Sequence, residues 1–264
     1  MTVEKLSGGE CMNGEQLAQL AEQAMTGNKK AVEQLMLASH TPVAWLCGKL
    51  LPEAAARKQT REILKAIPKG MDFLEDPADF EKWLCKTTAT RCMHAAAELP
   101  SAQSQPEKPK FPARTLNETQ TAHAVVRLVD GLPREPRLCL LLYSCGMLSF
   151  TTIGQLLGCP KEAVLEHLHD AQKRLNNQMR AYYTQGVRFA PITSLPTLLR
   201  TAMYSGGDPK AAAAMVGGIL GKNAPAAPKK KRKKKPDGLL IAVIAAAVLL
   251  ILLVGLILFL ELAR

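Results

Sequence analysis

The chain has 264 residues and a formal net charge of +11, and its length is typical of one or two domains. Seven of the positive charges lie in one run at residues 229–235, and the residues after that run carry a net charge of −1, so residues 1–228 carry only +5. A high pI that comes from one short run is weak grounds for nucleic-acid binding, because the body of the chain is only mildly basic.

The seven cysteines lie at residues 11, 47, 85, 92, 139, 145 and 159. Their number is odd, none forms a CxxC pair, and no secretory signal peptide precedes them, which predicts free thiols in a reducing cytosol. Cys85, Cys92 and His94 come nearest to a metal-ligand set, but their spacing fits no zinc pattern well. The sequence also lacks a phosphate-binding loop and a nucleophile–base constellation. We therefore expect no metal, no cofactor and no enzymatic activity.

Apolar residues recur at helical spacing along residues 1–98, and the alternation typical of strands does not occur. Pro42 interrupts or kinks the second predicted helix, Pro68 ends the third, and Asp76 or Asp79 caps the fourth. The four predicted helices cover residues 15–25, 30–51, 53–67 and 79–97. We interpret residues 1–98 as the first domain of an all-α protein.

A proline-rich linker is predicted over residues 99–117, because four prolines and several small polar residues lie within residues 99–114. A second helical domain follows over residues 118–183. Its first clearly predicted helix covers residues 135–143. The sequence thus predicts two small helical domains joined by a linker.

The middle of the second domain has the pattern of a helix-turn-helix. Ser149 is a good N-cap for a helix over residues 150–157, Gly158 suits a left-handed C-terminal position, and Pro160 is tolerated where the next helix starts. That next helix runs from residue 161 to 175 and beyond. This arrangement is typical of DNA-binding proteins, although a generic helical hairpin would give the same pattern. The residues spaced to pack the two helices together are Ile153, Leu156, Leu157, Val164 and Leu168.

Residues 238–260 are 23 consecutive residues without a charge or a proline. As a helix they would span about 35 Å, which exceeds the ~30 Å hydrocarbon core of a bilayer, and they have no polar face. We predict a C-terminal transmembrane helix, joined to the second domain by a flexible tether over residues 184–237. Within the tether, residues 191–202 form a short amphipathic helix, and residues 211–228 are rich in Ala, Gly and Pro.

The basic run ends two residues before this apolar segment. Such a run can be a nuclear address, a grip on nucleic acid or the cytoplasmic flank of a membrane span. Its position favours the third, with about 1 kcal/mol per cation from anionic headgroups and with the N-terminal domains cytoplasmic and the C-terminus outside. The predicted membrane-surface residues are Lys229, Lys230, Lys231, Arg232, Lys233, Lys234 and Lys235.

The helix-turn-helix segment resembles region 4 of bacterial RNA polymerase sigma factors of the extracytoplasmic-function group. In that family the second helix enters the major groove of the minus-thirty-five promoter element. The residues that carry the resemblance are Leu148, Ser149, Phe150, Ile153, Leu157, Gly158, Val164, Leu168, His169, Ala171, Lys173, Arg174 and Leu175.

The resemblance implies that outward residues of this second helix contact promoter DNA. Three cations and three acids balance over residues 161–175, and acids that face phosphates oppose binding. Glutamate can still accept a hydrogen bond from cytosine, and His167 can donate one. The candidate DNA-binding residues of this helix are Lys161, Glu162, His167, Lys173 and Arg174.

Residues 35–51, 55–67 and 80–95 resemble three helices of region 2 in the same family. The second of these helices faces the polymerase clamp, and the third recognises the minus-ten element. The family's acidic pair is replaced here by Arg57 and Lys58, and such a reversal weakens an interface with an unchanged partner. The implied polymerase-binding residues are Arg57, Lys58, Arg61 and Glu62. The implied minus-ten contacts are Lys82, Trp83, Lys86 and Arg91.

The combined resemblance implies a sigma factor-like protein, anchored in the bacterial cytoplasmic membrane by a single span, that directs RNA polymerase to promoters in transcription initiation. The partners expected are the polymerase core, promoter DNA, anionic lipids, and an anti-sigma factor or membrane protease. The altered contact residues leave a second function open, in which the protein does not initiate transcription and is a membrane-tethered regulatory or interaction protein.

Overall fold

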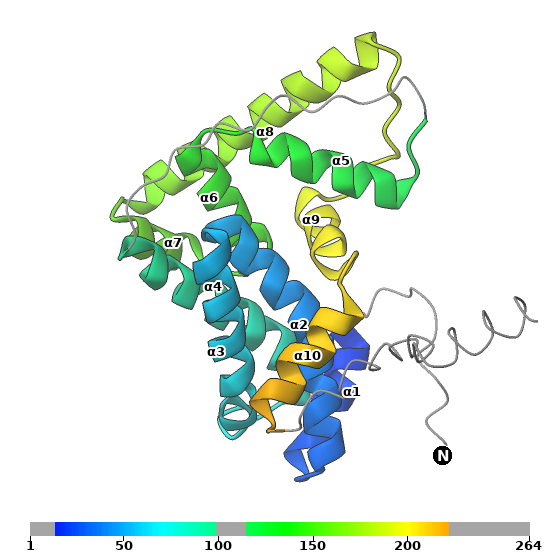
Figure 1. Ribbon diagram of the computed structural model, residues 1–264. Coiled ribbons are helices and arrows are strands. Elements are labelled where there is room, and N and C mark those ends of the chain that lie inside the picture. The colour runs from blue at the N-terminus through cyan, green and yellow to red at the C-terminus, as the bar shows by residue number, and fades with distance from the viewer. Residues whose placement is uncertain (1–13, 99–114, 222–264) are drawn as a thin grey trace, which may run out of the picture. The chain divides into compact units, whose positions relative to one another are not determined.

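The computed structural model describes residues 14–98 and 115–221, and the regular elements in these ranges are helices (Figure 1). An isolated bridge joins Thr115 to Arg188. The expectation of an all-α fold is confirmed for this part of the chain. None of the helices in the described ranges is long and apolar enough to cross a bilayer. The predicted span, the basic run before it and residues 99–114 of the predicted linker lie outside the described residues.

The N-terminal part of the structure, residues 14–98, is built from four helices and one short 3₁₀ turn. These are α1 (Gly14–Met25), α2 (Lys29–Leu50), α3 (Glu53–Met71), η1 (Pro77–Asp79) and α4 (Phe80–Ala97). Asn28 caps α2, since its Oδ1 accepts from the amides of Lys30 and Ala31. Asp76 caps the 3₁₀ turn through the amide of Ala78. The largest fully buried side chains of this part include Leu17, Leu35, Met36, Ile63, Leu64, Ile67, Phe80 and Leu84.

Helix α3 continues one turn beyond its predicted end at Pro68. Proline removes one backbone donor and disfavours the preceding helical turn, but near a C-terminus only the last turn is affected. Ile67 and Met71 are buried on the two sides of Pro68 and hold that turn on the core. The predicted helix end was therefore wrong, because the burial of Ile67 and Met71 outweighed the helix-breaking effect of Pro68.

The C-terminal part, residues 115–221, contains six helices. They are α5 (Glu118–Asp130), α6 (Arg134–Ser144), α7 (Phe150–Leu157), α8 (Lys161–Thr184), α9 (Leu195–Tyr204) and α10 (Pro209–Ile219). Asn117 and Gln120 form a reciprocal capping box at the start of α5. α7 begins and ends as predicted, with the Oγ of Ser149 accepting from the amide of Thr152 at 3.2 Å.

Residues 195–219 of the predicted tether form the two packed helices α9 and α10, of which the sequence had predicted only a short helix over residues 191–202. α9 lies against α5 and α6 and reaches α2, whereas α10 lies on α2 and α3 (Figure 1). Leu199, Ala202 and Met203 of α9 and Val216 of α10 are almost completely buried. α10 was not predicted, because its alanines and glycines give little hydrophobic periodicity.

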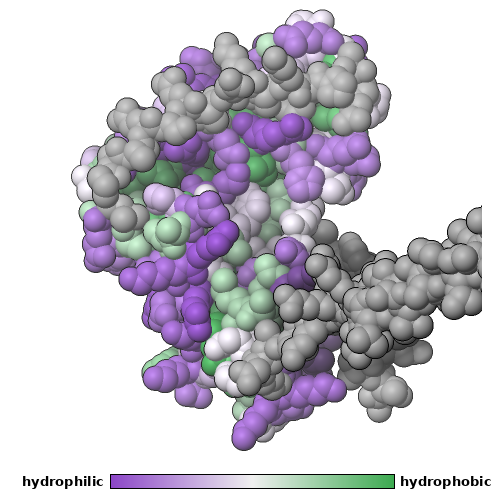
Figure 2. Space-filling view, viewed as in Figure 1, coloured by the Kyte–Doolittle hydropathy of each residue, from purple (hydrophilic) through white to green (hydrophobic). Residues whose placement is uncertain are grey.

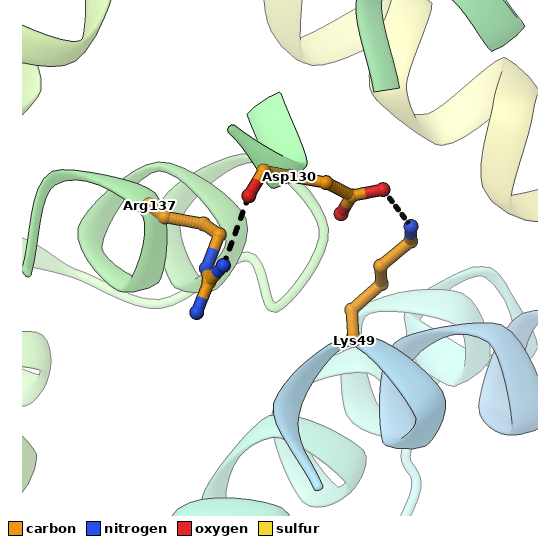
Figure 3. A network of polar contacts seen from close by, with 3 residues as sticks. All are labelled: Lys49, Asp130 and Arg137. Carbon is orange, nitrogen blue, oxygen red and sulfur yellow. Dashed lines mark hydrogen bonds and ion pairs between the residues drawn. The ribbon is translucent and has the colours of Figure 1, made fainter. Parts of the chain in front are cut away.

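The N-terminal and C-terminal parts share a hydrophobic core. Ala89 and Met93 of α4 and Leu46 of α2 belong to the same buried cluster as the leucines of α5 and α6. A polar contact at its edge joins the two parts, because Lys49 Nζ of α2 lies 2.5 Å from Asp130 Oδ2 of α5 (Figure 3). Arg137 of α6 donates to the backbone carbonyl of Asp130 at 3.0 Å. Within the described residues, the two predicted domains are therefore in direct contact through a common core.

A buried histidine in α2 gives the fold a pH dependence. His40 is only 6% exposed, and its Nδ1 has no hydrogen-bond partner among the described residues. Burial lowers the pKa of His40 from its ordinary 6.5, and Asp208 partly opposes this shift. The unfolded chain therefore binds the proton more readily than the folded one, so we expect stability to fall as the pH drops below about 6.5. Urea unfolding at a series of pH values should show a shallower acid slope for His40→Gln, and an unchanged slope would contradict this assignment.

Candidate nucleic-acid interface

α7 and α8 meet at a tight turn whose geometry depends on two glycines. Gly158 has a φ of +69°, the left-handed conformation that favours glycine. A Cβ on Gly154 would lie 2.6 Å from the carbonyl oxygen of Cys159, so this position also requires glycine. Ile153 and Val164 are fully buried between the two helices, and Leu168 packs against the same core. The turn and these contacts fix the direction in which α8 leaves α7.

The exposed face of α8 is acidic in its first half and basic in its second. Glu162 and Glu166 lie near the N-terminus, whereas Lys173 and Arg180 follow on the same helical stripe. The exposed residues of this stripe are Glu162, Leu165, Glu166, His169, Lys173, Asn176 and Arg180. An anion that approaches the middle and end of α8 therefore meets cations, while its first turns present hydrogen-bond acceptors.

Four of the five predicted DNA-binding residues of α8 are exposed, and the fifth is half-buried. Lys161, Glu162, Lys173 and Arg174 are exposed, but His167 is half-buried and the exposed imidazole is that of His169. Arg180 is also exposed but was not among the predicted contacts, although its seven-residue spacing from Lys173 puts both on one helical face. The resemblance that supplied the predicted contacts ends at Leu175, whereas α8 continues to Thr184.

An ion pair restrains one of the predicted cations of α8. The Nε of Arg174 donates to Asp170 Oδ2 at 2.7 Å, one turn earlier on the helix. Both side chains are partly exposed, so the pair contributes little to stability. It nevertheless offers Arg174 a carboxylate in competition with a phosphate, which leaves Lys173 and Arg180 as the cations better placed for an external anion.

The predicted contacts of α4 do not form one face. Lys82 and Lys86 are four residues apart and exposed on one side, whereas Arg91 lies near Glu62 of α3, whose pKa is lowered mainly by Lys65 and to a smaller extent by Arg91. Lys82 also lies 3.7 Å from Asp79. The structure therefore brings Lys82 and Lys86 together and separates Arg91 from them.

Trp83 packs against α3 as a half-buried core residue. Its indole covers Gly70 so closely that a Cβ there would lie 2.0 Å from the ring. Phe80 lies beside it, with ring centroids 5.8 Å apart. In this arrangement the six-membered ring of the indole packs on Gly70 of α3, so this part of Trp83 would have to move before it could contact a base.

The four predicted polymerase-binding residues cluster on α3. Arg57 and Lys58 are exposed, and Arg57 donates to Glu53 at 2.7 Å. Glu62 accepts from Lys65 at 2.8 Å, and this hydrogen bond is the main reason that the pKa of Glu62 lies below its ordinary range. Arg61 differs from the others, because its Nη2 lies 3.5 Å from the carbonyl oxygen of Gly218 in α10.

Two of the described cysteines, Cys47 and Cys92, contact each other in the core. Cys92 contacts Cys47, with the two Sγ atoms 3.2 Å apart, and both are fully buried. Burial raises the pKa of the Cys85 thiol to about 12, which keeps it protonated at neutral pH. His94 is exposed at the other side of α4. Across residues 14–98 and 115–221, no group of three His, Cys, Asp or Glu side chains is arranged to hold a metal ion.

Comparison with known proteins gave no match to a family model, to a curated protein or to a solved structure.

Proposed function

We propose that this protein is a membrane-anchored, sigma factor-like regulator of transcription, with α7, the turn at Gly158 and α8 acting as a helix-turn-helix. The observation that carries the proposal is the junction of α7 and α8, in which a Ser149 cap, a left-handed glycine and a buried Ile153–Val164 contact orient a long, charged helix outward. In DNA-binding proteins of this type the start of the second helix reaches base edges.

The charges of α8 suit DNA binding, because acidic side chains lie at its start and cations lie farther along its exposed side. Glu162 and Glu166 at its start can accept hydrogen bonds from cytosine amino groups in the major groove. Lys173 and Arg180 lie farther along the exposed stripe, where positive charge would face phosphates. Affinity would then come from the second half of α8 and sequence preference from the first half.

The resemblance to regions 2 and 4 implies that the partner is RNA polymerase and that the protein acts in promoter recognition. The α3 cluster of Arg57, Lys58, Arg61 and Glu62 would contact the clamp of the polymerase core, and α4 would contact the minus-ten element. The apolar run at residues 238–260 would anchor the chain, with the basic run at 229–235 on the cytoplasmic surface. Residues 220–237 would then extend at most about 60 Å.

A non-initiating regulatory protein is the second candidate, and two contacts favour it. Asp170 engages Arg174, and Asp79 lies near Lys82, so two of the implied DNA-binding cations already have acidic neighbours. Such a protein would bind a polymerase subunit or a regulator through α3 without opening DNA.

Polymerase binding tests the proposal directly. The full-length chain, purified in detergent, is expected to form a complex with the bacterial polymerase core that survives size-exclusion chromatography. A fragment that stops at residue 180 is unsuitable, since it removes the buried residues of α9 and α10 and exposes the core. Absence of any complex, both for the unmodified chain and for a variant in which the packing of α10 on α2 and α3 is broken, would reject the sigma-like mechanism.

DNA binding and run-off transcription then separate the two candidates. For an initiating factor, Lys173→Ala is expected to weaken binding to a fluorescent mixed-sequence duplex and to reduce the salt slope by about one. Lys29→Ala, an exposed lysine at the start of α2, is the matched control and should change neither. A polymerase complex that yields no run-off transcript from genomic promoter fragments would favour the non-initiating protein.

A further inference from the structure

The helix that would read the minus-ten element is buried on two sides. Phe80, Leu84 and Cys92 of α4 pack into the core of the N-terminal part. On another side, Ala89 and Met93 pack into the core shared with α5, α6 and α9. Glu81 at the start of α4 accepts a hydrogen bond from the hydroxyl of Tyr204 in α9 at 3.0 Å. Much of α4 is therefore unavailable for DNA in this arrangement.

Helices α9 and α10 bridge the N-terminal and C-terminal parts, and we name residues 195–219 the clasp. α9 is held between α5, α6 and α2, and α10 lies on α2 and α3. Between them Gly207 contacts Thr41 of α2 so closely that a Cβ on Gly207 would lie 2.0 Å from Thr41 Oγ1. At the far end of α10, the carbonyl of Gly218 meets Arg61, one of the implied polymerase contacts. The clasp thus touches both implied functional surfaces of the N-terminal part.

The distance between the two promoter elements is too large for α4 and α8 to contact both of them while the N-terminal and C-terminal parts share one core. The minus-ten and minus-thirty-five elements are about 25 base pairs apart, which corresponds to about 85 Å of duplex at 3.4 Å per base pair. Packed helices lie only about 8–10 Å apart, and α4 is in contact with α7, the first helix of the helix-turn-helix. α4 and α8 could occupy the two elements together only after the N-terminal and C-terminal parts separate.

We propose that the structure is a closed, autoinhibited form in which the clasp holds the two parts together and hinders polymerase and promoter binding. The inference rests on the proposed function, because the surfaces that it describes as masked are those of a sigma-like protein. If only a fraction of molecules is open, the apparent affinity for polymerase is reduced by that fraction. Opening the clasp therefore raises polymerase affinity without changing any residue that contacts polymerase.

The composition of α10 makes it the part of the clasp that releases most readily. Only Ala212 and Val216 of its eleven residues are buried, and its sequence is rich in alanine and glycine. Figure 2 shows a mildly hydrophobic surface over α10 beside strongly hydrophilic neighbours. A segment with few buried side chains opens at low cost compared with the core. α10 also ends ten residues before Lys229, so a force or cleavage at the membrane side would act on it first.

The first test places a charge under or beside α10 in the full-length chain. Val216→Asp buries a carboxylate against α2 and α3, and Ala213→Asp places the same group on the exposed side of α10 as the matched control. We expect Val216→Asp to speed amide exchange in residues 195–219 and to tighten binding to the polymerase core at least about ten-fold. Ala213→Asp should behave like the unmodified chain in both measurements.

A reversible lock provides the second test if Val216→Asp unfolds the protein. Thr41→Cys combined with Gly207→Cys joins the clasp to α2, since the two β-carbons would lie within bonding reach after a small shift. Oxidised glutathione takes two electrons and two protons from the two thiols as the disulfide forms, and a thiol reductant reverses the change. We expect the oxidised form to bind polymerase at least about ten-fold more weakly than the reduced form.

The outcomes distinguish failure of the autoinhibition proposal from failure of the proposed function. Faster exchange in Val216→Asp with unchanged polymerase affinity, or equal affinity of the locked and reduced forms, would overturn autoinhibition and leave the proposed function intact. Exchange of residues 195–219 that is as fast in the unmodified chain as in Val216→Asp would also overturn it. If no variant binds polymerase, the proposed function fails and the inference fails with it, whatever the exchange data show.

Discussion

Replacing Phe80 with alanine is expected to lower the free energy of unfolding by about 3–5 kcal/mol. Phe80 is the first residue of α4, its side chain is 0% exposed, and it packs with Leu84 and the leucines of α2 and α3. The loss combines the transfer of the ring from water with the cavity that it leaves. Because small proteins are stable by only about 5–15 kcal/mol, this one change should be visible as a large shift in the urea midpoint.

Phe73→Ala is the matched control, because the same atoms are removed from a ring that is 84% exposed. Its effect should stay within about 0.5 kcal/mol. Equilibrium urea unfolding, followed by far-ultraviolet circular dichroism in the full-length chain, measures both variants. Equal midpoints for Phe80→Ala and Phe73→Ala would show that α4 is not packed as described.

Gly146→Ala is expected to destabilise the protein by about 1–3 kcal/mol through overpacking. A Cβ on Gly146 would lie 2.6 Å from the carbonyl oxygen of Leu142 and 2.7 Å from the β-carbon of Ala89. The first neighbour is backbone and the second is the first atom of a helical side chain, so neither can move away cheaply. The added methyl group therefore pushes the end of α6 away from α4, where the N-terminal and C-terminal parts meet.

Gly48→Ala makes the same chemical change with the opposite expected sign. Gly48 lies near the end of α2, is exposed, and a Cβ there would meet no atom within 4 Å. Alanine favours the helix over glycine by about 0.5–1 kcal/mol, so this variant should be slightly more stable. Thermal unfolding of the two variants beside the unmodified chain measures both signs, and stabilisation by Gly146→Ala would refute the close contact between Gly146 and Ala89 of α4.

Local signals accounted for most of the helices. Ser149 and Gly158 marked the ends of α7 correctly, because a cap and a left-handed glycine act within a few residues of each other. Pro68 misled the prediction for α3, since buried neighbours on both sides kept its last turn helical. α10 was missed because four consecutive alanines indicate neither a face nor a partner.

The sequence identified residues of the right chemical type for the candidate contacts, but it did not show which of them are exposed or what packs against them. Lys173 and Glu162 are exposed as expected, yet the exposed histidine of α8 is His169 and Trp83 lies over Gly70. Helical spacing places residues on a common stripe, but which stripe faces solvent depends on the elements packed around the helix. α4 illustrates this, because its small residues are buried on more than one side and give no single apolar face.

The sequence by itself determined the all-α class, most helix boundaries and the α7–α8 turn, because periodicity, capping and glycine conformation are local properties of the chain. It also contains the basic and apolar runs on which the proposed membrane anchor rests. Only the tertiary structure decided that Tyr204 of α9 meets Glu81 of α4 and that α10 returns to α2 and α3 beside Arg61. These contacts join residues more than a hundred positions apart, and their stability comes from the shape and burial of both partners, which no local pattern specifies.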